Sequence, residues 1–199
     1  MPRPLCLLPA LVLSLVAAGT ATAQAAPAAA LATPAAAAPA APDVGAAAPA
    51  FTMPAVDATG AASTVSLAAL RGKVVVLAFY PKDRTSGCTA QLQKFRDEYA
   101  ALFGPKAGRD VVLIPVSADG LASHAAWAGE ARFPFALASD TTLDVASRYG
   151  SRRAGASTPS RTAFVIDRQG RVAYRDLRFN ALSEDAYRQL AEAVRKAGE

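Results

Sequence analysis

The sequence predicts an α/β fold of three layers, in which helices cover both faces of a mixed central sheet. Three observations support this prediction. Two short apolar runs, 74–80 and 111–116, are typical of strands that are buried on both faces. Segments with helical spacing of apolar residues follow these runs. The chain then shows a hairpin pattern and a last amphipathic helix, an order that suits a mixed sheet between helical layers.

The first predicted helix lies between the two apolar runs. Leu92, Phe95, Tyr99 and Leu102 recur at spacings of three and four residues, which places them on one face of a helix. Gly104-Pro105 ends the pattern. The strand 74–80 and the strand 111–116 are therefore connected through a helix, as in parallel sheets.

The remaining predicted elements follow the strand 111–116. They are helices at 121–131 and 142–149, a strand at 133–138 between them, a hairpin of 162–166 and 172–174 with its turn at 167–170, and a helix from about 183 to 197. Ser183 is a candidate cap for this last helix. The order is that expected of a thioredoxin-like domain, although other α/β sheets share much of it.

The first 42 residues differ in composition from the rest. Residues 1–23 combine a cationic start at Arg3, an apolar stretch at 5–18 and a small-residue exit at 21–23, which predicts a secretory signal cleaved before Gln24. The apolar stretch is shorter than the roughly 18 residues of a membrane span, so a retained anchor is the weaker alternative. We therefore expect export, to the periplasm, without membrane insertion after cleavage.

Two further segments complete the predicted organisation. Residues 24–42 contain twelve alanines, four prolines and no charge, which predicts a disordered linker. Residues 43–199 number 157, enough for one domain with a substantial core.

The composition excludes several classes of function. One histidine and two cysteines, Cys6 and Cys88, exclude a multi-histidine metal site, a four-thiolate zinc site and a disulfide framework. No glycine-rich phosphate loop is present, so we expect neither a metal nor an organic cofactor. The pair Arg152-Arg153 is interpreted as a solvated loop, because no basic face or motif accompanies it to indicate nucleic-acid binding.

Cys88 is the residue with the clearest chemical potential. It lies four residues before Leu92, on the core-facing side of the first helical turn, and the turn 81–87 separates it from the buried strand 74–80. Unpaired backbone N–H groups and the helix dipole favour a thiolate at such a position. The alternative is a small buried side chain without chemistry, which is common for free cysteines. After signal cleavage Cys88 would be the single cysteine of the chain.

The residues around Cys88 resemble the peroxiredoxins, and most of all the bacterioferritin comigratory protein or peroxiredoxin Q subgroup. PKDRTSGCT after VVVLAFY is similar to the family motif Pro-x-x-x-Thr-x-x-Cys. The similarity covers about 43–174, through the segments DVGAAAPAF, CTAQLQKFRDEY, ALASD, SRYG and RTAFVID.

This resemblance implies a role for each of several residues. Cys88 would be the nucleophile that attacks a peroxide, Thr85 would bind thiolate and peroxide, and Pro81 would shield the pocket from water. Arg161 would stabilise the thiolate, since a planar cation suits that task. Without the resemblance, Thr85 is interpreted as a helix cap and Arg161 as an exposed strand-edge residue. Two further positions, Gln91 and Arg96, match supporting residues of the family, or are plain surface residues.

Two positions depart from the subgroup. Ser86 stands where proline is usual, and Gln93 stands where the subgroup often has a resolving cysteine. The resemblance therefore implies one-cysteine chemistry, in which an external thiol, either a thioredoxin-like protein or a small thiol, reduces the sulfenic acid of Cys88. The implied substrates are hydrogen peroxide and organic hydroperoxides, the implied role is antioxidant defence and redox homeostasis, and the chain would be a monomer or a homodimer.

Two other functions remain open on the sequence. An exported thioredoxin-type thiol-disulfide oxidoreductase would need a second cysteine where Gln91 stands. A binding module that kept the fold and lost the chemistry would not need the set Pro81, Thr85, Cys88 and Arg161. His124 and Trp127 share a helix face and are interpreted as surface and packing residues without a role in the chemistry.

Overall fold

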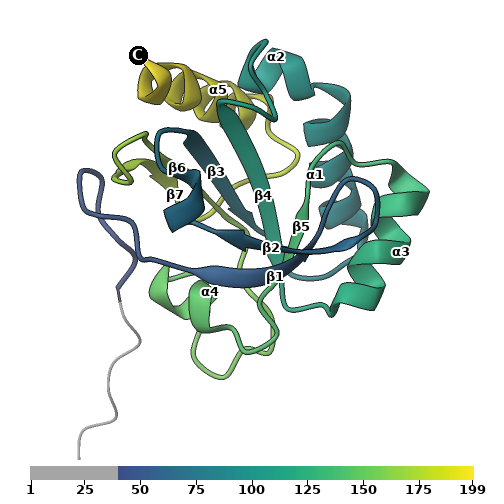
Figure 1. Cartoon of the computed structure of the whole chain (residues 1–199). Helices are drawn as coiled ribbons and strands as arrows, with labels where there is room; N and C mark the ends of the chain where they lie inside the picture. Colours follow the sequence, from purple (N-terminus) through teal and green to yellow (C-terminus); the bar gives the residue numbers. More distant parts are fainter. Residues whose placement is uncertain (1–39) are drawn as a thin grey trace, which may run out of the picture. The chain divides into compact units, whose positions relative to one another are not determined.

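The computed structural model describes residues 40–199. The predicted signal and most of the predicted linker lie outside the described residues. A seven-stranded sheet in the order β2-β1-β5-β4-β3-β6-β7 forms the centre of the domain (Figure 1). Its strands are β1 (Thr52–Val56), β2 (Ala62–Ser66), β3 (Val74–Phe79), β4 (Val111–Ser117), β5 (Leu137–Ser139), β6 (Thr162–Ile166) and β7 (Val172–Asp176).

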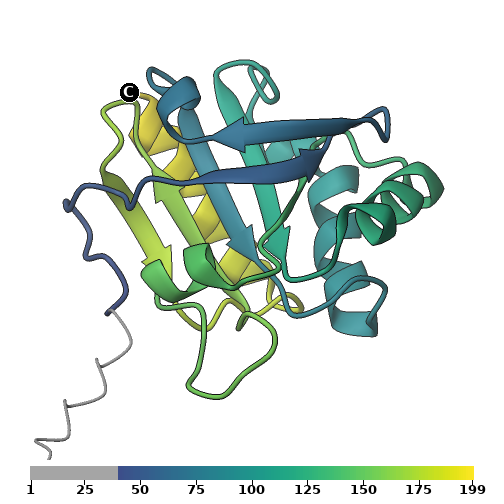
Figure 2. The ribbon, with the colours of Figure 1, turned by 60° about the horizontal axis from the view of Figure 1, so that its bottom comes forward.

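Helices cover both faces of this sheet. They are α1 (Ser86–Asp97), α2 (Tyr99–Phe103), α3 (Leu121–Ala131), α4 (Asp144–Arg148) and α5 (Glu184–Gly198), with a short 3-10 turn η1 (Ala68–Leu70). Figure 2 shows α4 on the opposite side of the sheet from α5. The arrangement confirms the predicted three-layer α/β fold with a mixed sheet, since β3, β4 and β5 are parallel and the other neighbouring pairs are antiparallel.

The strand β3 separates two hydrophobic cores. Val74, Val76 and Ala78 pack with the core under α1, α2, α3 and α5, whereas the alternate residues Val75 and Leu77 pack with the core under α4. All six residues of β3 are buried, because side chains of a strand point alternately to the two faces and both faces are covered. This explains the unbroken apolar run in the sequence.

Most predicted elements are present, with shifts at their ends. The helix α3 has the predicted bounds, and the helical pattern 92–102 divides at Glu98 into α1 and α2. The prediction of a strand at 133–138 is wrong in position, because the strand found there, β5, begins only at Leu137. Phe133 and Phe135 instead stack on each other before β5 begins, with ring centroids 5.2 Å apart. The helix expected at 142–149 is the shorter α4, preceded by Leu143 in a left-handed conformation.

The sequence did not indicate the hairpin of β1 and β2. Pro54 lies inside β1, and β2 (ASTVS) has no fully buried residue, so neither segment shows the apolar pattern of a strand. The hairpin joins the sheet because Ala55 and Val56 pair with β5.

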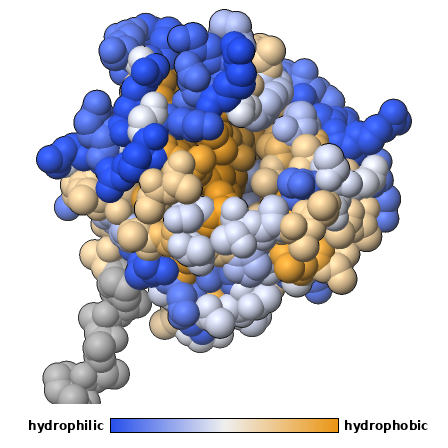
Figure 3. Space-filling view, in the orientation of Figure 1, coloured by the Kyte–Doolittle hydropathy of each residue, from blue (hydrophilic) through white to orange (hydrophobic). Residues whose placement is uncertain are grey.

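One face of the domain has an apolar hollow over the central strands (Figure 3). Within β4, only Val116 and Ser117 pair with β5, so the first part of β4 has no neighbouring strand on that side. Figure 3 shows apolar side chains at the floor of a hollow over the central strands. Among residues 40–199, no helix has the length and apolar character needed to span a membrane.

Phe95 provides a test of the core under α1. Its fully buried ring contacts Phe103, Phe179 and Tyr187. We expect Phe95→Ala to lower the free energy of unfolding by about 3–5 kcal/mol, because it leaves a cavity where packing is dense. Urea denaturation measures this loss. The exposed neighbour Gln93, changed to Ala, should cost about 0.5 kcal/mol or less. Equal losses for the two variants would contradict the assignment of faces on α1.

Candidate active site

A tight turn carries the chain from the end of β3 into α1. The N–H of Tyr80 donates to the carbonyl of Val116 at 3.0 Å, which holds the last residue before the turn to β4. The turn spans 81–85, with Thr85 as the N-terminal cap residue of α1. Cys88 lies in the first turn of this helix and is fully buried. The backbone N–H groups and the dipole at this end of the helix favour a negative charge on its sulfur.

Arg161 reaches Cys88 from the start of β6, the strand next to β3 in the sheet. The strand β6 runs antiparallel to β3, and its first residue, Thr162, pairs with Phe79. Arg161 therefore stands beside the turn that follows β3. Its Nη2 donates to the Sγ of Cys88 at 3.4 Å. A guanidinium at this distance stabilises a thiolate by charge as well as by a hydrogen bond.

Two residues of α1 fit around the guanidinium of Arg161. Gln91 is fully buried, and its Oε1 accepts a hydrogen bond from Nη1 of Arg161. Gly87 leaves room for the arginine, since a Cβ at residue 87 would lie 3.2 Å from Nη2. Gln91 is thus part of the site, and its interpretation as a surface residue is wrong. Sulfur, guanidinium and amide form one connected group.

The other predicted site residues are placed differently. Thr85 is exposed and its Oγ1 donates to the carbonyl of Lys82 at 3.1 Å, so its hydroxyl neither caps α1 nor bonds the sulfur of Cys88. Pro81 is half-buried at the start of the turn. Arg96 lies two turns along α1, where its Nη1 donates to the carbonyl of Ala131 at 2.8 Å. Arg96 connects α1 to the end of α3 and does not contact Cys88.

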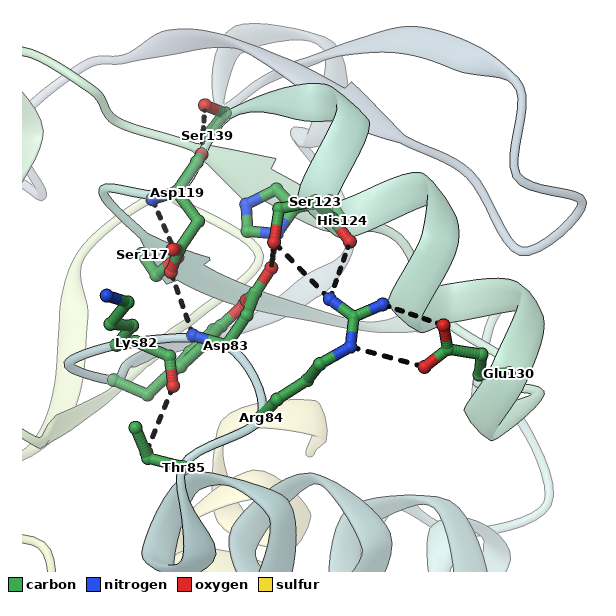
Figure 4. A network of polar contacts seen from close by, with 11 residues as sticks. Lys82, Asp83, Arg84, Thr85, Ser117, Asp119, Ser123, His124, Glu130 and Ser139 are labelled. Atoms are coloured by element: carbon green, nitrogen blue, oxygen red, sulfur yellow. Dashed lines mark hydrogen bonds and ion pairs between the residues drawn. The ribbon is translucent and has the colours of Figure 1, made fainter.

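A buried polar network lies behind the turn (Figure 4). One carboxylate oxygen of Asp83 accepts a hydrogen bond from the Tyr80 hydroxyl at 2.8 Å. The other oxygen accepts from the Ser123 hydroxyl at 2.6 Å and lies 3.0 Å from Nδ1 of His124. The N–H of Asp83 donates to the carboxylate of Asp119 at 2.8 Å. The turn is therefore bound to α3 and to the loop after β4.

The position of His124 corrects the sequence interpretation. His124 is fully buried and faces Asp83, so it is not a surface residue, whereas Trp127 packs against Tyr80 and Phe133 as expected. Helical spacing alone does not identify the partner of His124, because Asp83 is 41 residues away. The available signal was an acidic residue in the turn before Cys88 together with the one histidine of the chain.

Charge and burial oppose each other at Asp83. Burial disfavours the carboxylate, but the hydrogen bonds from His124 and Ser123, the interaction with the imidazole and the bond from Tyr80 outweigh it and lower the pKa of Asp83. Burial, and then the charge of Asp83, raise the pKa of Tyr80 well above its ordinary value. The phenol therefore stays a hydrogen-bond donor to a carboxylate.

The described residues offer no group of three or more metal-ligating side chains. A sulfur beside a guanidinium at a helix N-terminus is suited to attack an electrophile that reaches it, while the cation stabilises the charge.

Acid denaturation tests the charge state of Asp83. Because its pKa is lowered by folding, the carboxylate contributes stability that is fully present above about pH 4 and is lost as the pH falls through the folded-state pKa. Asp83→Asn should cost about 1–3 kcal/mol at pH 7. Its free energy of unfolding should then fall less steeply below about pH 4 than that of the wild type. Chemical denaturation at a series of pH values checks this, and parallel profiles would contradict it.

Comparison with known proteins agrees with this geometry. The model of the AhpC/TSA family matches residues 44–175. Peroxiredoxin Q of Triticum aestivum is 45% identical over 112 residues, which are 56% of this chain and 50% of that protein. Peroxiredoxin Q of Populus jackii is 41% identical over 110 residues, which are 55% of this chain and 50% of that protein. The chain thus spans about half the length of these curated relatives.

Solved structures share the fold. The reduced 2-Cys peroxiredoxin of Plasmodium vivax has a TM-score of 0.66 at 27% identity, covering 77% of this chain and 96% of that one. The mitochondrial 2-Cys peroxiredoxin of Plasmodium falciparum has a TM-score of 0.64 at 26% identity, and the match covers 78% of this chain and 98% of that one. The thioredoxin-like fold of these proteins is the fold found here. By its matched residues and its architecture, the chain belongs to the AhpC/TSA family, as a peroxiredoxin of the peroxiredoxin Q type.

Proposed function

We propose that the chain is a thiol peroxidase that reduces hydrogen peroxide and organic hydroperoxides through Cys88. The observation that carries this proposal is the contact of Arg161 with the sulfur of Cys88, 3.4 Å long, at the N-terminus of α1. The resemblance of the turn 81–88 to the peroxiredoxin motif and the family membership of the chain support it.

The geometry is suited to a two-electron oxidation of sulfur. The thiolate of Cys88 attacks one oxygen of the peroxide, the O–O bond breaks, and the leaving oxygen takes a proton to become water or an alcohol. The sulfur is oxidised to a sulfenic acid and the peroxide is reduced. Arg161 stays beside the sulfur throughout and stabilises negative charge as it moves from sulfur to the leaving oxygen.

We assign a one-cysteine cycle to the chain. Gln93, five residues after Cys88, is exposed and has no thiol, and the only other cysteine, Cys6, lies in the predicted signal. An external thiol then condenses with the sulfenic acid to a mixed disulfide and releases water. A second thiol reduces that disulfide and restores Cys88. The donor is a thioredoxin-like protein or a small thiol.

Thiol-disulfide exchange of the thioredoxin type is less well supported. Its second cysteine would stand at residue 91, where the side chain of Gln91 is buried and bonded to Arg161. The predicted signal supports export of the peroxidase from the cytoplasm to the periplasm. There it would remove peroxides as a defence against oxidation.

Peroxide consumption by the full chain tests this function. With a dithiol donor in excess, the wild type should consume hydrogen peroxide, and Cys88→Ser should not, because the nucleophile is lost. Cys6→Ser should keep the wild-type rate. The proposal fails if wild-type Cys88 reacts with peroxide no faster than a free small thiol under the same conditions.

Arg161 provides a second test. Arg161→Met should lower the second-order rate constant with hydrogen peroxide by about 100-fold or more, because the donor to the sulfur is lost. Arg161→Lys should be intermediate, since an ammonium cannot hold both Gln91 and the sulfur. Stopped-flow measurement separates these rates. The control Arg168→Met changes an exposed arginine in the β6–β7 turn, at the opposite end of β6. Similar losses at residues 161 and 168 would contradict the role.

A further inference from the structure

We propose that Ser151 is a positioning residue for the reaction at Cys88. It holds the chain on both sides of Arg161 and thereby keeps the guanidinium against the sulfur. None of its own hydrogen bonds goes to Cys88 or to the guanidinium, so its effect on the chemistry passes through Arg161. This inference rests on the proposed peroxidase function and adds to it a residue of the connection between α4 and β6.

All three polar groups of Ser151 are hydrogen-bonded, and the residue is fully buried. Its N–H donates to the carbonyl of Ala146 at 2.7 Å, and its carbonyl accepts from the N–H of Ser160 at 2.5 Å. Its hydroxyl lies 2.6 Å from the hydroxyl of Thr162, and either oxygen can be the donor. The two residues that flank Arg161 in the chain are thus both bonded to Ser151.

The end of α4 fixes the place of Ser151. Gly150 has a φ of 64°, and its N–H donates to the carbonyl of Ser147 at 3.0 Å. Together with the N–H bond of Ser151, this makes a Schellman motif. A Cβ at residue 150 would lie 2.7 Å from the Cβ of Ala41, so glycine is required there. The residue after such a glycine often makes an apolar contact, whereas a buried serine needs a partner for its hydroxyl. That partner is Thr162.

The segment that carries Arg161 needs a restraint of this kind. Arg161 stands one residue before β6, outside the pairing with β3 that begins at Thr162. The loop 152–159 comes before it, and Figure 2 shows this loop extending away from the sheet. Residues 152–155 are all exposed. A loop of this kind does not fix the position of the residues that follow it. The bonds of Ser151 at the base of the loop supply that restraint.

The position of the guanidinium decides how strongly it acts on the sulfur. Nη2 of Arg161 lies 3.4 Å from Sγ of Cys88, while Nη1 donates to Gln91. A charge interaction weakens with distance, and a hydrogen bond depends on its angle as well. A displacement of about 1 Å in the segment 160–162 would therefore weaken the stabilisation of the sulfur and slow its reaction.

Variants that remove one hydroxyl test this dependence. Ser151→Ala and Thr162→Val should each lower the second-order rate constant of the full chain with hydrogen peroxide about tenfold. In an Arg161→Met background the same changes should lower it less than about twofold, because no guanidinium remains to be positioned. Thr162→Ser keeps the hydroxyl and should stay within about threefold of the wild type. Stopped-flow measurement gives all of these rates.

Competition between two alkylating reagents detects the guanidinium without peroxide. Iodoacetate is an anion and iodoacetamide is neutral, and each forms an S–C bond with the thiolate of Cys88 and releases iodide. Because the reagents are of similar size, the ratio of their products depends mainly on the charge beside the sulfur. Ser151→Ala and Thr162→Val should lower the ratio of iodoacetate to iodoacetamide product about threefold. Peptide mass spectrometry measures this ratio at Cys88 separately from Cys6.

The matched control is Ser147→Ala. Ser147 also belongs to α4, but its hydroxyl donates to the carbonyl of Leu143 at 2.7 Å, away from the segment 160–162. This variant should change the peroxide rate and the product ratio by less than about twofold. If Ser151→Ala does not fold, Thr162→Val decides instead, since valine suits a strand.

Two results would overturn the inference. One is an equal loss of peroxide rate in the wild-type and Arg161→Met backgrounds, which would mean that Ser151 acts on the fold alone. The other is an unchanged product ratio in both Ser151→Ala and Thr162→Val. Alkylation does not require peroxidase activity. A wild type that consumed no peroxide would therefore refute the proposed function, while the product ratio would still decide on Ser151.

Discussion

The antiparallel pairing of β6 with β3 is the constraint on which the candidate site depends. Cys88 and Arg161 are 73 residues apart in the chain, and they meet because Thr162 pairs with Phe79 at the end of β3. A slip of one residue in this register would turn alternate side chains to the opposite face. The residues that fix the register are the buried apolar side chains of both strands. The chemistry of the sulfur is thus determined by packing in the centre of the sheet.

Much of the fold could be predicted because burial on two faces leaves a strong trace in the sequence. The apolar run of β3 and the stripe of α1 are of this kind, and both elements lie where they were expected. The hairpin of β1 and β2 left no such trace, since its pairing at the sheet edge needs backbone hydrogen bonds more than apolar side chains. Phe133 and Phe135 show the opposite case: two large apolar residues marked a strand, but they pack as stacked rings in a loop.

The candidate site was predictable only in part, for a related reason. Cys88 and its turn are contiguous, and the resemblance to a known motif supplied Arg161. The partners of Asp83 are not contiguous, and no periodicity relates residue 83 to residue 124. Thr85 illustrates a further limit. A motif gives a residue its expected role, but here its hydroxyl bonds Lys82 within the turn. Which of several local partners a hydroxyl selects depends on backbone geometry that the sequence does not display.

Trp127 has a practical consequence, as the single tryptophan of the chain. It lies one helical turn after His124, and its indole packs edge-on against Tyr80, with ring centroids 6.1 Å apart. Its ring also contacts Phe133 and is almost fully buried. Indole emission depends on the polarity of its surroundings and on nearby quenching groups. Trp127 is therefore an intrinsic fluorescent probe next to Tyr80, the residue before the turn 81–85. A change in its emission would report a movement of this turn without an added label.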